Sequence, residues 1–184
     1  AWSYRTGALE LHPDLIAKSG YQATPILLSE EAGGHLVTCT PFNRVIALDP
    51  VTGEEQWIFD PKLDTENRAA GRFNCRGVTA WSDNKAEADQ ACSHRIILAT
   101  NDRRLMAIDS HNGKPCAEFG EGGQFDVTPL IVAIKPAKQL DGMQLMSPVA
   151  IVNDVIIIGG TANKFKDVSS MNGALRAFDV RTGK

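Results

Sequence analysis

A short phrase that occurs three times constrains the fold of this chain more than any other feature. The three copies are Ala47-Leu-Asp-Pro-Val-Thr-Gly53, Ala107-Ile-Asp-Ser-His-Asn-Gly113 and Ala177-Phe-Asp-Val-Arg-Thr-Gly183. Each copy follows a short apolar run and ends in a small or polar turn closed by glycine, which is the chemistry that ends one strand and begins a hairpin. The repetition indicates a repeat architecture in which each copy marks one supersecondary unit.

Runs of β-type sequence surround each copy of the phrase. The first copy lies among Ala23–Leu28, His35–Thr40, Arg44–Leu48 and Gln56–Phe59. The second lies among Gly77–Trp81, Arg95–Ala99, Leu105–Ile108 and Pro115–Phe119, and the third among Pro148–Val152, Val155–Gly159 and Leu175–Phe178. Four strands per repeat is the pattern of a propeller blade. The predicted fold class is therefore all-β, a β-propeller of four-stranded antiparallel blades, with about three blades in this chain.

The predicted blades are residues 22–60, 75–120 and 147–184, preceded by a blade remnant at residues 1–6. Trp2 occupies the place in that remnant that Trp57 takes after the first repeated phrase. Three blades cannot close into a ring, so their edges would need more chain or other copies to cover them. The sequence is therefore expected to be a fragment of a longer propeller, and self-association through open blade edges is a further expectation.

Charge and apolar patterning exclude two classes of partner. The net charge is −3 and the longest basic run is Arg103-Arg104, so nothing indicates a surface for a phosphate backbone, and nucleic acid is not an expected partner. The longest apolar stretch, Val149–Gly160, is interrupted by Asn153-Asp154 and is far below the roughly 20 residues that span a bilayer. Contact with a membrane is expected only through segments absent here.

The four cysteines lack the Cys-x-x-Cys spacing of a structural zinc site. Disulfide pairing stays open at this stage. Cys92 and Cys116 are candidates for one bridge, because they fall at the same end of strands two and four of one predicted blade.

Two longer motifs point to a family. The phrase Ala-x-Asp-x-x-Thr-Gly-x-x-x-Trp is complete from Ala47 to Trp57, and a second run begins Asn74-Cys-Arg-Gly-Val-Thr-Ala-Trp81 and continues to Asn112-Gly-Lys-Pro-Cys116. The first resembles the tryptophan-docking motif of the dehydrogenases that depend on pyrroloquinoline quinone (PQQ), the quinoproteins. The second resembles their membrane-bound glucose and quinate/shikimate branch. The docking motif indicates a fold and leaves activity open, because its tryptophan packs between neighbouring blades.

The resemblance implies an eight-bladed propeller that holds PQQ over its axis beside Ca²⁺ or Mg²⁺. It implies a periplasmic enzyme, with an inner-membrane anchor as an option for the parent protein, that oxidises a sugar, polyol or cyclitol hydroxyl by hydride transfer to PQQ and passes electrons to a quinone-type acceptor. In such enzymes the proton-accepting Asp and most metal ligands lie in later blades. This segment is therefore expected to contain no catalytic residue and no metal ligand, and to be inactive alone.

The chain departs from the family pattern at two positions. Cys75 stands without the adjacent second cysteine of alcohol-oxidising relatives, which favours the sugar or cyclitol branch. Ala117 falls where the docking tryptophan of the second blade would be, so that blade is expected to pair with its neighbour without an aromatic clamp.

Propeller topology predicts which loops reach a cofactor. Because the innermost strand of a blade runs one way and the second returns, the loop into the first and the loop out of the second lie on one face, the mouth. Loops leading into the innermost strands place Gln22, Arg76 and Ser147 there. Loops leaving the second strands place Thr40–Asn43, Asn101–Arg103 and Gly160–Asn172 beside them.

PQQ is a planar ortho-quinone with three carboxylates, so its site needs cationic and hydrogen-bonding groups. The resemblance implies that Arg76 contacts PQQ, and a guanidinium fork suits a carboxylate; a salt bridge at the rim is the alternative. Gln22 sits where alcohol-oxidising relatives carry Glu, and its amide can still bond to a quinone carboxylate or carbonyl.

Four further positions complete the candidate site. Ser147 and Thr161 match family positions whose hydroxyls bond to the quinone, although Ser and Thr at strand ends often only satisfy turns. Gly160 would let the backbone bend or approach closely. Trp81 lies five residues after the Arg-Gly arginine, as in the methanol dehydrogenase form of the motif, and is either part of the cofactor site or a core aromatic. Glucose-type relatives commonly have His at this position, so the resemblance leaves the substrate class open.

A non-catalytic propeller of the same repeat, used as a scaffold for protein–protein interaction, is the competing hypothesis. The long excursions at residues 60–74, 82–93 and 161–172 and the Arg-Gly sequence at Arg76 favour the enzyme.

Overall fold

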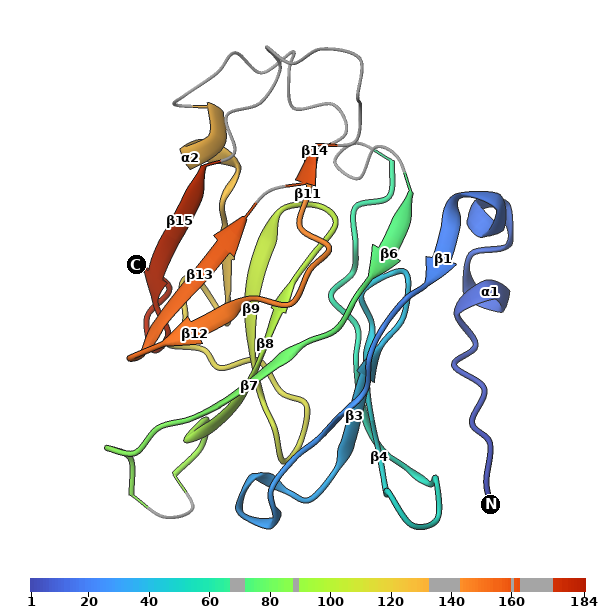
Figure 1. Cartoon of the computed structure of the whole chain (residues 1–184), viewed down its shortest axis with the longest axis horizontal. Coiled ribbons are helices and arrows are strands. Elements are labelled where there is room, and N and C mark those ends of the chain that lie inside the picture. The colour runs from blue at the N-terminus through green and yellow to red at the C-terminus, as the bar shows by residue number, and fades with distance from the viewer. Residues whose placement is uncertain (67–71, 88–89, 133–142, 160, 163–173) are drawn as a thin grey trace.

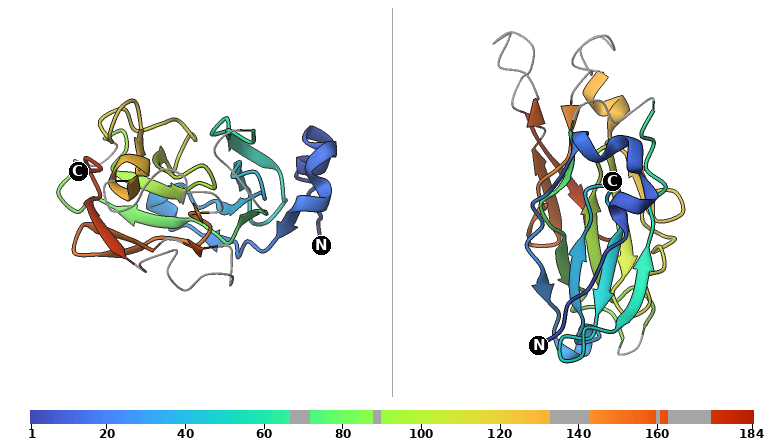
Figure 2. Two further views of the ribbon diagram at one scale, coloured as in Figure 1. Left: turned by 90° about the horizontal axis from the view of Figure 1, so that it is seen from above. Right: turned by 90° about the vertical axis from the view of Figure 1, so that its right-hand side faces the viewer.

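The computed structural model describes residues 1–66, 72–87, 90–132, 143–159, 161–162 and 174–184 (Figure 1). Three antiparallel sheets dominate, with strand orders β2-β3-β4-β5, β10-β9-β8-β7 and β12-β13-β15. The sheets lie side by side. The strand of each sheet that comes first along the chain (β2, β7 or β12) lies toward the viewer in Figure 1 and along one side of the view from above in Figure 2. The predicted all-β propeller architecture is confirmed.

The strand bounds follow the repeats. The first sheet contains β2 (Ile26–Leu27), β3 (Leu36–Cys39), β4 (Val45–Leu48) and β5 (Glu55–Phe59). The second contains β7 (Thr79–Ser82), β8 (His94–Ala99), β9 (Arg104–Asp109) and β10 (Gln124–Asp126), and the third β12 (Ala150–Val152), β13 (Val155–Gly159) and β15 (Leu175–Asp179). Two small pairs join β1 (Ser19–Tyr21) to β6 (Phe73–Cys75) and β11 (Met143–Gln144) to β14 (Thr161–Ala162). The short helices are α1 (Ala8–Leu11), η1 (Pro13–Lys18), η2 (Glu30–Ala32) and α2 (Thr128–Val132), of which η1 and η2 are 3₁₀ helices.

Most of the core consists of two apolar layers, one between each pair of neighbouring sheets, and a smaller buried cluster contains Ala8, Phe42 and Phe73. Strand β8 contributes to both layers: Ile96 and Leu98 pack toward the first sheet, and Ile97 and Ala99 pack toward the third. Because successive side chains of a strand point to opposite faces, a strand in a middle sheet must be apolar at every position. This requirement explains the continuous run from Ile96 to Ala99.

Each repeated phrase forms a turn whose first side chain caps the turn backbone. The Asp49 Oδ1 atom accepts hydrogen bonds from the backbone N–H groups of Thr52 (2.7 Å) and Val51 (2.8 Å), and these bonds lower the pKa of the carboxyl group. Asp179 accepts from its own turn in the same way. The closing glycine has a φ of 77° at Gly53 and 73° at Gly183, a left-handed conformation that favours glycine.

The closing glycines also serve as docking sites for an aromatic ring of the preceding blade. Gly53 lies against the ring of Trp2 and Gly113 against the ring of Trp57, so closely that a Cβ atom at Gly113 would lie 2.7 Å from the Trp57 ring. The indole N–H of Trp57 donates to the carbonyl of Ser110 at 3.1 Å, and that of Trp2 donates to the equivalent carbonyl at 3.2 Å. The predicted architectural role of Trp57 is confirmed by these contacts, and Trp2 makes the equivalent ones.

The expectation that Ala117 leaves the second blade without an aromatic clamp is wrong. Phe119 lies against Gly183 as the two tryptophans lie against their glycines, with ring atoms 3.2–3.3 Å from where a Cβ would be. The phenylalanine side chain has no N–H donor, and the Nη1 atom of Arg95 donates instead to the carbonyls of Val180 (3.2 Å) and Arg181 (2.9 Å). A side chain from a turn, Phe119, and one from β8, Arg95, thus replace the ring and the donor of one tryptophan.

The fourth strand of the second sheet is β10, so its predicted position at Pro115–Phe119 is wrong. Pro115 makes only an isolated bridge to Ile108, and the next segment turns, with the Phe119 N–H bonded to the Cys116 carbonyl. Proline lacks the N–H that a strand ladder needs. A later segment therefore pairs with β9, from Gln124 opposite Met106 to Asp126 opposite Arg104.

Candidate cofactor-binding site

The loops that lead into β2, β7 and β12 form a continuous row at one end of the sheets. The backbone N–H of Thr24 donates to the Arg76 carbonyl at 3.1 Å, and the N–H of Arg76 donates to the Met146 carbonyl at 2.9 Å. Ser147 follows Met146 directly, and Gln22 contacts Arg76. The structure therefore brings Gln22, Arg76 and Ser147 together at the predicted mouth, and all three side chains are exposed.

Two connections hold the first and second sheets together at the mouth. Strand β1 pairs in parallel with β6, with Tyr21 opposite Cys75. A disulfide joins Cys75 to Cys39, the last residue of β3. The absence of an adjacent cysteine therefore does not leave Cys75 unpaired, and the residue before Arg76 is covalently fixed to the neighbouring sheet.

Gln22 is the centre of the side-chain contacts at the mouth. Its Oε1 atom accepts a hydrogen bond from the Nδ2 atom of Asn74 at 2.5 Å and another from the Nε atom of Arg76 at 3.3 Å. Asn74 is 7% exposed, whereas Gln22 and Arg76 face solvent. Sequence reasoning missed Asn74, because its position inside β6 gave no sign that its side chain would contact Gln22.

The alternative interpretation of Arg76 was a salt bridge at the rim. In the part of the chain that the structure describes, its only side-chain partner is the amide oxygen of Gln22, and no carboxylate lies within salt-bridge distance. Among the described residues, the terminal N–H donors of the guanidinium therefore have no carboxylate partner. An exposed cation with unused donors suits an anionic ligand.

The loops leaving β3 and β8 are closed against each other. Asn43 and Asn101 are buried, and the Oδ1 atom of Asn43 accepts from both the backbone N–H (2.8 Å) and the Nδ2 atom (2.7 Å) of Asn101. Asp102 pairs with Arg104 at 2.7 Å. These two predicted loops of the mouth therefore fasten neighbouring blades, while the loops that contain Gln22, Arg76 and Ser147 remain accessible.

Trp81 lies away from the other candidates, five residues beyond Arg76, which corresponds to roughly 16 Å along an extended chain. Its indole N–H donates to the Asp154 carboxylate at 3.2 Å, and the guanidinium of Arg181 lies 4.9 Å from the centre of its ring. Asp154 belongs to the β12–β13 turn at the other end of the blade. This environment is the one expected of a core aromatic between blades.

The last two candidates are described only in part. Gly160 lies outside the described residues, and of Thr161 only the backbone is described, in β14 opposite Gln144. Gln144 is 1% exposed, and neither end of its amide has a hydrogen-bond partner among the described residues. A buried amide without hydrogen-bond partners costs free energy. Gln144 lies three residues before Ser147 in the sequence, and sequence reasoning did not single it out.

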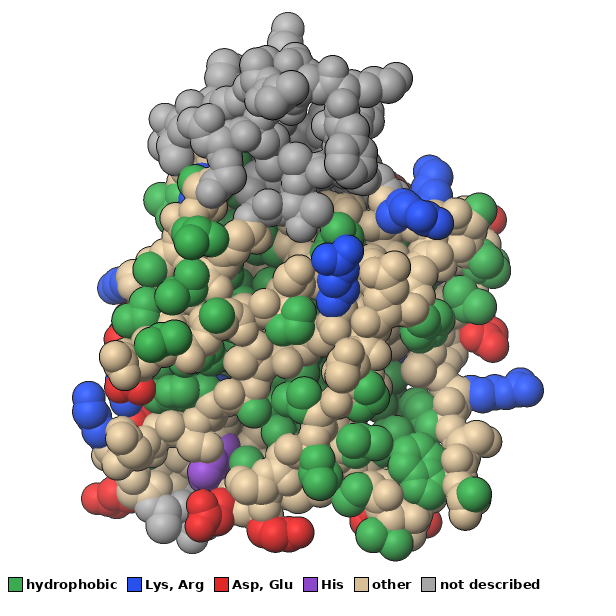
Figure 3. Space-filling model, viewed as in Figure 1, with side chains coloured by type: hydrophobic (Ala, Val, Ile, Leu, Met, Phe, Trp, Pro, Cys, Tyr) green, Lys and Arg blue, Asp and Glu red, His purple; other side chains and the backbone are tan. Residues whose placement is uncertain are grey.

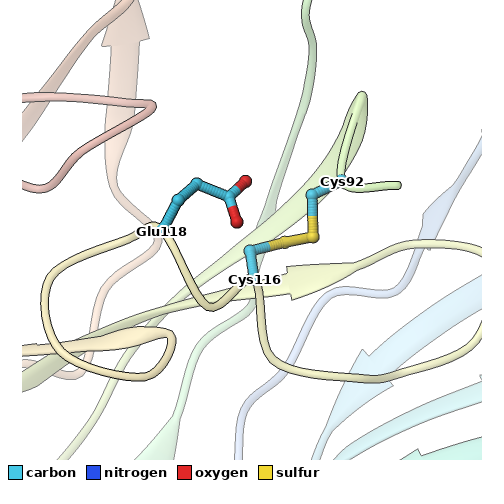
Figure 4. Close-up of side chains that lie close together, drawn as sticks. All are labelled: Cys92, Cys116 and Glu118. Atoms are coloured by element: carbon cyan, nitrogen blue, oxygen red, sulfur yellow. A yellow bond between two sulfur atoms is a disulfide. The ribbon is translucent and has the colours of Figure 1, made fainter. Parts of the chain in front are cut away.

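Another cluster of potential metal-ligand side chains is already bonded within the protein. Cys92, Cys116 and Glu118 are the one group of three potential metal ligands within 4.8 Å of one another in the described ranges. Figure 4 shows that the two cysteines form a disulfide, which confirms the candidate bridge, and Glu118 pairs with Arg95. Because disulfide sulfurs offer no thiolate, this cluster does not have the chemistry of a metal site.

On the face shown in Figure 3, several acidic side chains lie along the lower edge, and Lys and Arg side chains lie near the centre, at the upper right and at both sides. None of the helices in the described part of the chain has the length and apolar character needed to cross a membrane.

Comparison with known proteins identifies the family. The PQQ family model, described as the β-propeller domain of glucose, ethanol and alcohol dehydrogenases, matches residues 1–184. The quinoprotein glucose dehydrogenase A of Acinetobacter calcoaceticus is 31% identical over 195 residues, which cover 100% of this chain and 23% of that protein. The quinoprotein glucose dehydrogenase of Escherichia coli K12 is 33% identical over 189 residues, with 100% and 22% covered.

Other similarities extend over the same region. The quinate/shikimate dehydrogenase (quinone) of Acinetobacter baylyi is 25% identical over 199 residues, which cover 100% of this chain and 23% of that protein. Among solved structures, a quinohemoprotein alcohol dehydrogenase of Pseudomonas putida HK5 superposes with a TM-score of 0.66 at 25% identity, covering 91% of this chain and 20% of that one. The chain thus spans about a quarter of the length of these curated relatives. By its sequence match over all 184 residues and its blade architecture, the chain belongs to the PQQ β-propeller family of quinoprotein dehydrogenases.

Proposed function

We propose that these blades form part of the PQQ cradle of a dehydrogenase that oxidises a sugar, polyol or cyclitol hydroxyl by hydride transfer to PQQ. Gln22, Arg76 and Ser147 are the proposed ligands, with Gly160 and Thr161 as further candidates. The observation that carries the proposal is the exposed Arg76 guanidinium, which contacts an amide oxygen and no carboxylate in the described part of the chain.

The donor set at the mouth fits the chemistry of the cofactor. PQQ has three carboxylates and a quinone, which are all acceptors, and the mouth offers a guanidinium, an amide and a hydroxyl as donors. Arg76 can hold a carboxylate through two parallel N–H bonds, and Gln22 and Ser147 can bond to neighbouring oxygens. When bound, PQQ would supply the electrophilic carbon that receives hydride.

The described residues would bind and orient the quinone. The backbone bonds among Thr24, Arg76 and Met146 fix the spacing of the three loops, and the Cys39–Cys75 disulfide restrains the middle loop. Preorganised donors of this kind reduce the entropy that a ligand must lose on binding. Trp81 has no place in this arrangement, since its contacts lie at the other end of its strand.

Further properties of the whole protein are proposed from the family. We place it in the periplasm, with a quinone-type electron acceptor and with Ca²⁺ or Mg²⁺ beside PQQ, held mostly by residues outside this segment. The proton-accepting Asp is proposed to lie outside it too, so the 184-residue chain is expected to reduce no dye with PQQ, Ca²⁺ and glucose or quinate. Robust dye reduction would contradict this assignment.

The scaffold alternative has weaker support. BamB of Moraxella catarrhalis superposes with a TM-score of 0.52 at 14% identity, covering 82% of this chain and 35% of that one, which is a likeness of fold alone. The enzyme proposal is preferred because the relatives with 31% and 33% identity are both quinoprotein glucose dehydrogenases.

Titration of the purified chain with PQQ, followed by quenching of tryptophan fluorescence, tests the proposal. Arg76→Gln should weaken binding by about tenfold or more, since a hydrogen-bonded charge pair contributes about 1.5–3 kcal/mol. Arg76→Lys should recover only part of the affinity, because Lys cannot form the bidentate fork. Arg72→Gln is the matched control: Arg72 is an exposed arginine just before β6, and its loss should change affinity far less. Equal losses from both glutamine variants would show nonspecific attraction and reject the assigned role of Arg76.

A further inference from the structure

The orientation of the Gln22 side-chain amide follows from its two neighbours. The Nε atom of an arginine can only donate a hydrogen bond, so the Gln22 atom 3.3 Å from Arg76 Nε must be the carbonyl oxygen. The Asn74 atom 2.5 Å from that same oxygen must then be its amide nitrogen. Each assignment requires the next, and the Nε2 group of Gln22 is left pointing away from both neighbours.

Asn74 is well placed to enforce this orientation. It lies in the middle of β6, paired with Gly20 of β1, and its neighbour Cys75 is held by a disulfide. Its side chain is more than nine-tenths buried, and its Oδ1 atom has no partner among the described residues. The one side-chain hydrogen bond shown for Asn74 is therefore the one it donates to Gln22.

We propose that Asn74 is a positioning residue that holds the Gln22 carbonyl toward the protein, so that the Gln22 Nε2 group and the Arg76 guanidinium present only N–H donors at the mouth. The inference rests on the proposed function and specifies the ligand group: an oxygen acceptor, above all a carboxylate of PQQ. If the amide were reversed, the Gln22 oxygen would face the ligand and repel it.

A double-mutant cycle with PQQ as the probe tests this role. Asn74→Leu removes the donor with little change in side-chain shape and should weaken PQQ binding by about tenfold or more, as expected for one lost hydrogen bond to a charged group. In a Gln22→Leu background, Asn74→Leu should cause no further loss, because Asn74 acts through Gln22. Gln22→Glu keeps an acceptor for Asn74 and Arg76 but removes the N–H donors, and should weaken binding at least as much as Asn74→Leu.

Nuclear magnetic resonance of the Gln22 side chain gives a readout that a purely structural role would not change. In the wild-type chain, PQQ should shift the Nε2 protons of Gln22 downfield, and in Asn74→Leu this shift should be lost while the melting temperature stays close to that of the wild type. Wild-type binding combined with an unchanged affinity of Asn74→Leu, or with equal losses in both backgrounds of the cycle, would overturn the positioning role and leave the proposed function standing. Failure of the folded wild-type chain to bind PQQ would overturn both.

Discussion

Protonation of Asp83 should weaken the attachment of the second sheet to the third. The Arg181 side chain holds Asp83 through two hydrogen bonds of 2.7 and 2.6 Å and holds Asp154 through a third of 2.9 Å. The same guanidinium lies over the Trp81 ring at 4.9 Å. Asp83 directly follows β7, whereas Arg181 belongs to the third repeated turn, so this clamp crosses the boundary between blades.

The magnitude follows from the acidity of Asp83. Its hydrogen bonds to Arg181 are the main cause that lowers the pKa of the carboxyl from the ordinary 3.8 to about 2. A tenfold difference in proton affinity corresponds to about 1.4 kcal/mol, so this lowering of the pKa gives an upper bound of about 2.5 kcal/mol, which solvent screening reduces to about 1 kcal/mol. Because the pKa is lowered on folding, the stabilisation is complete above about pH 4 and is lost as the pH falls toward 2.

Urea unfolding of the wild type and Asp83→Asn between pH 6 and pH 2 measures this contribution. At pH 6 the variant should be less stable by about 1 kcal/mol, and the two free energies of unfolding should converge near pH 2. Asp14→Asn, at an exposed position in η1, is the control and should not show this convergence. A difference between wild type and Asp83→Asn that stays constant from pH 6 to pH 2 would refute the reasoning.

Two further predictions concern glycine docking and the disulfide at the mouth. Gly113→Ala should lower the melting temperature clearly more than Gly122→Ala. Both glycines have positive φ (72° and 63°), but only a Cβ at position 113 would lie against Trp57. Equal losses of stability would contradict the docking role. Replacing both Cys39 and Cys75 by serine should cost about 2–5 kcal/mol in denaturant unfolding and weaken PQQ binding, because Arg76 follows the bridge directly; unchanged PQQ affinity would show that the bridge does not order the site.

The sheets could be predicted because their signals are local. Each repeat has an Asp that caps its own turn and a glycine with positive φ, so the same residue types recur at the same spacing. The Asn153-Asp154 hairpin is equally local, since both residues adopt positive φ between paired strands. Such features depend on a few consecutive residues, so one sequence is enough to find them.

Two features that the sequence did not reveal, the clamp of the second blade and the pairing of Cys75, each divide one function between distant residues. A search for a docking tryptophan stops at Ala117 and does not find a ring from Phe119 combined with a donor from Arg95. The Cys39–Cys75 bridge connects two different repeats, so comparing positions within one blade cannot reveal it. In both cases the missing information was the contact between blades rather than the sequence of either blade.

Hydrogen-bonding capacity distinguishes the two ends of the blades. At the turn end, Asp49, Asp83 and Asp154 have their carboxylates bonded to backbone N–H groups or to Arg181, so those charges are largely satisfied by the protein itself. At the mouth, Arg76 donates one N–H hydrogen bond to Gln22, and no carboxylate of the described residues pairs with its other N–H donors. This contrast supports the proposal that Arg76 binds an anionic ligand, because its loop is ordered by backbone bonds and a disulfide while its guanidinium is exposed and meets no carboxylate of the described residues.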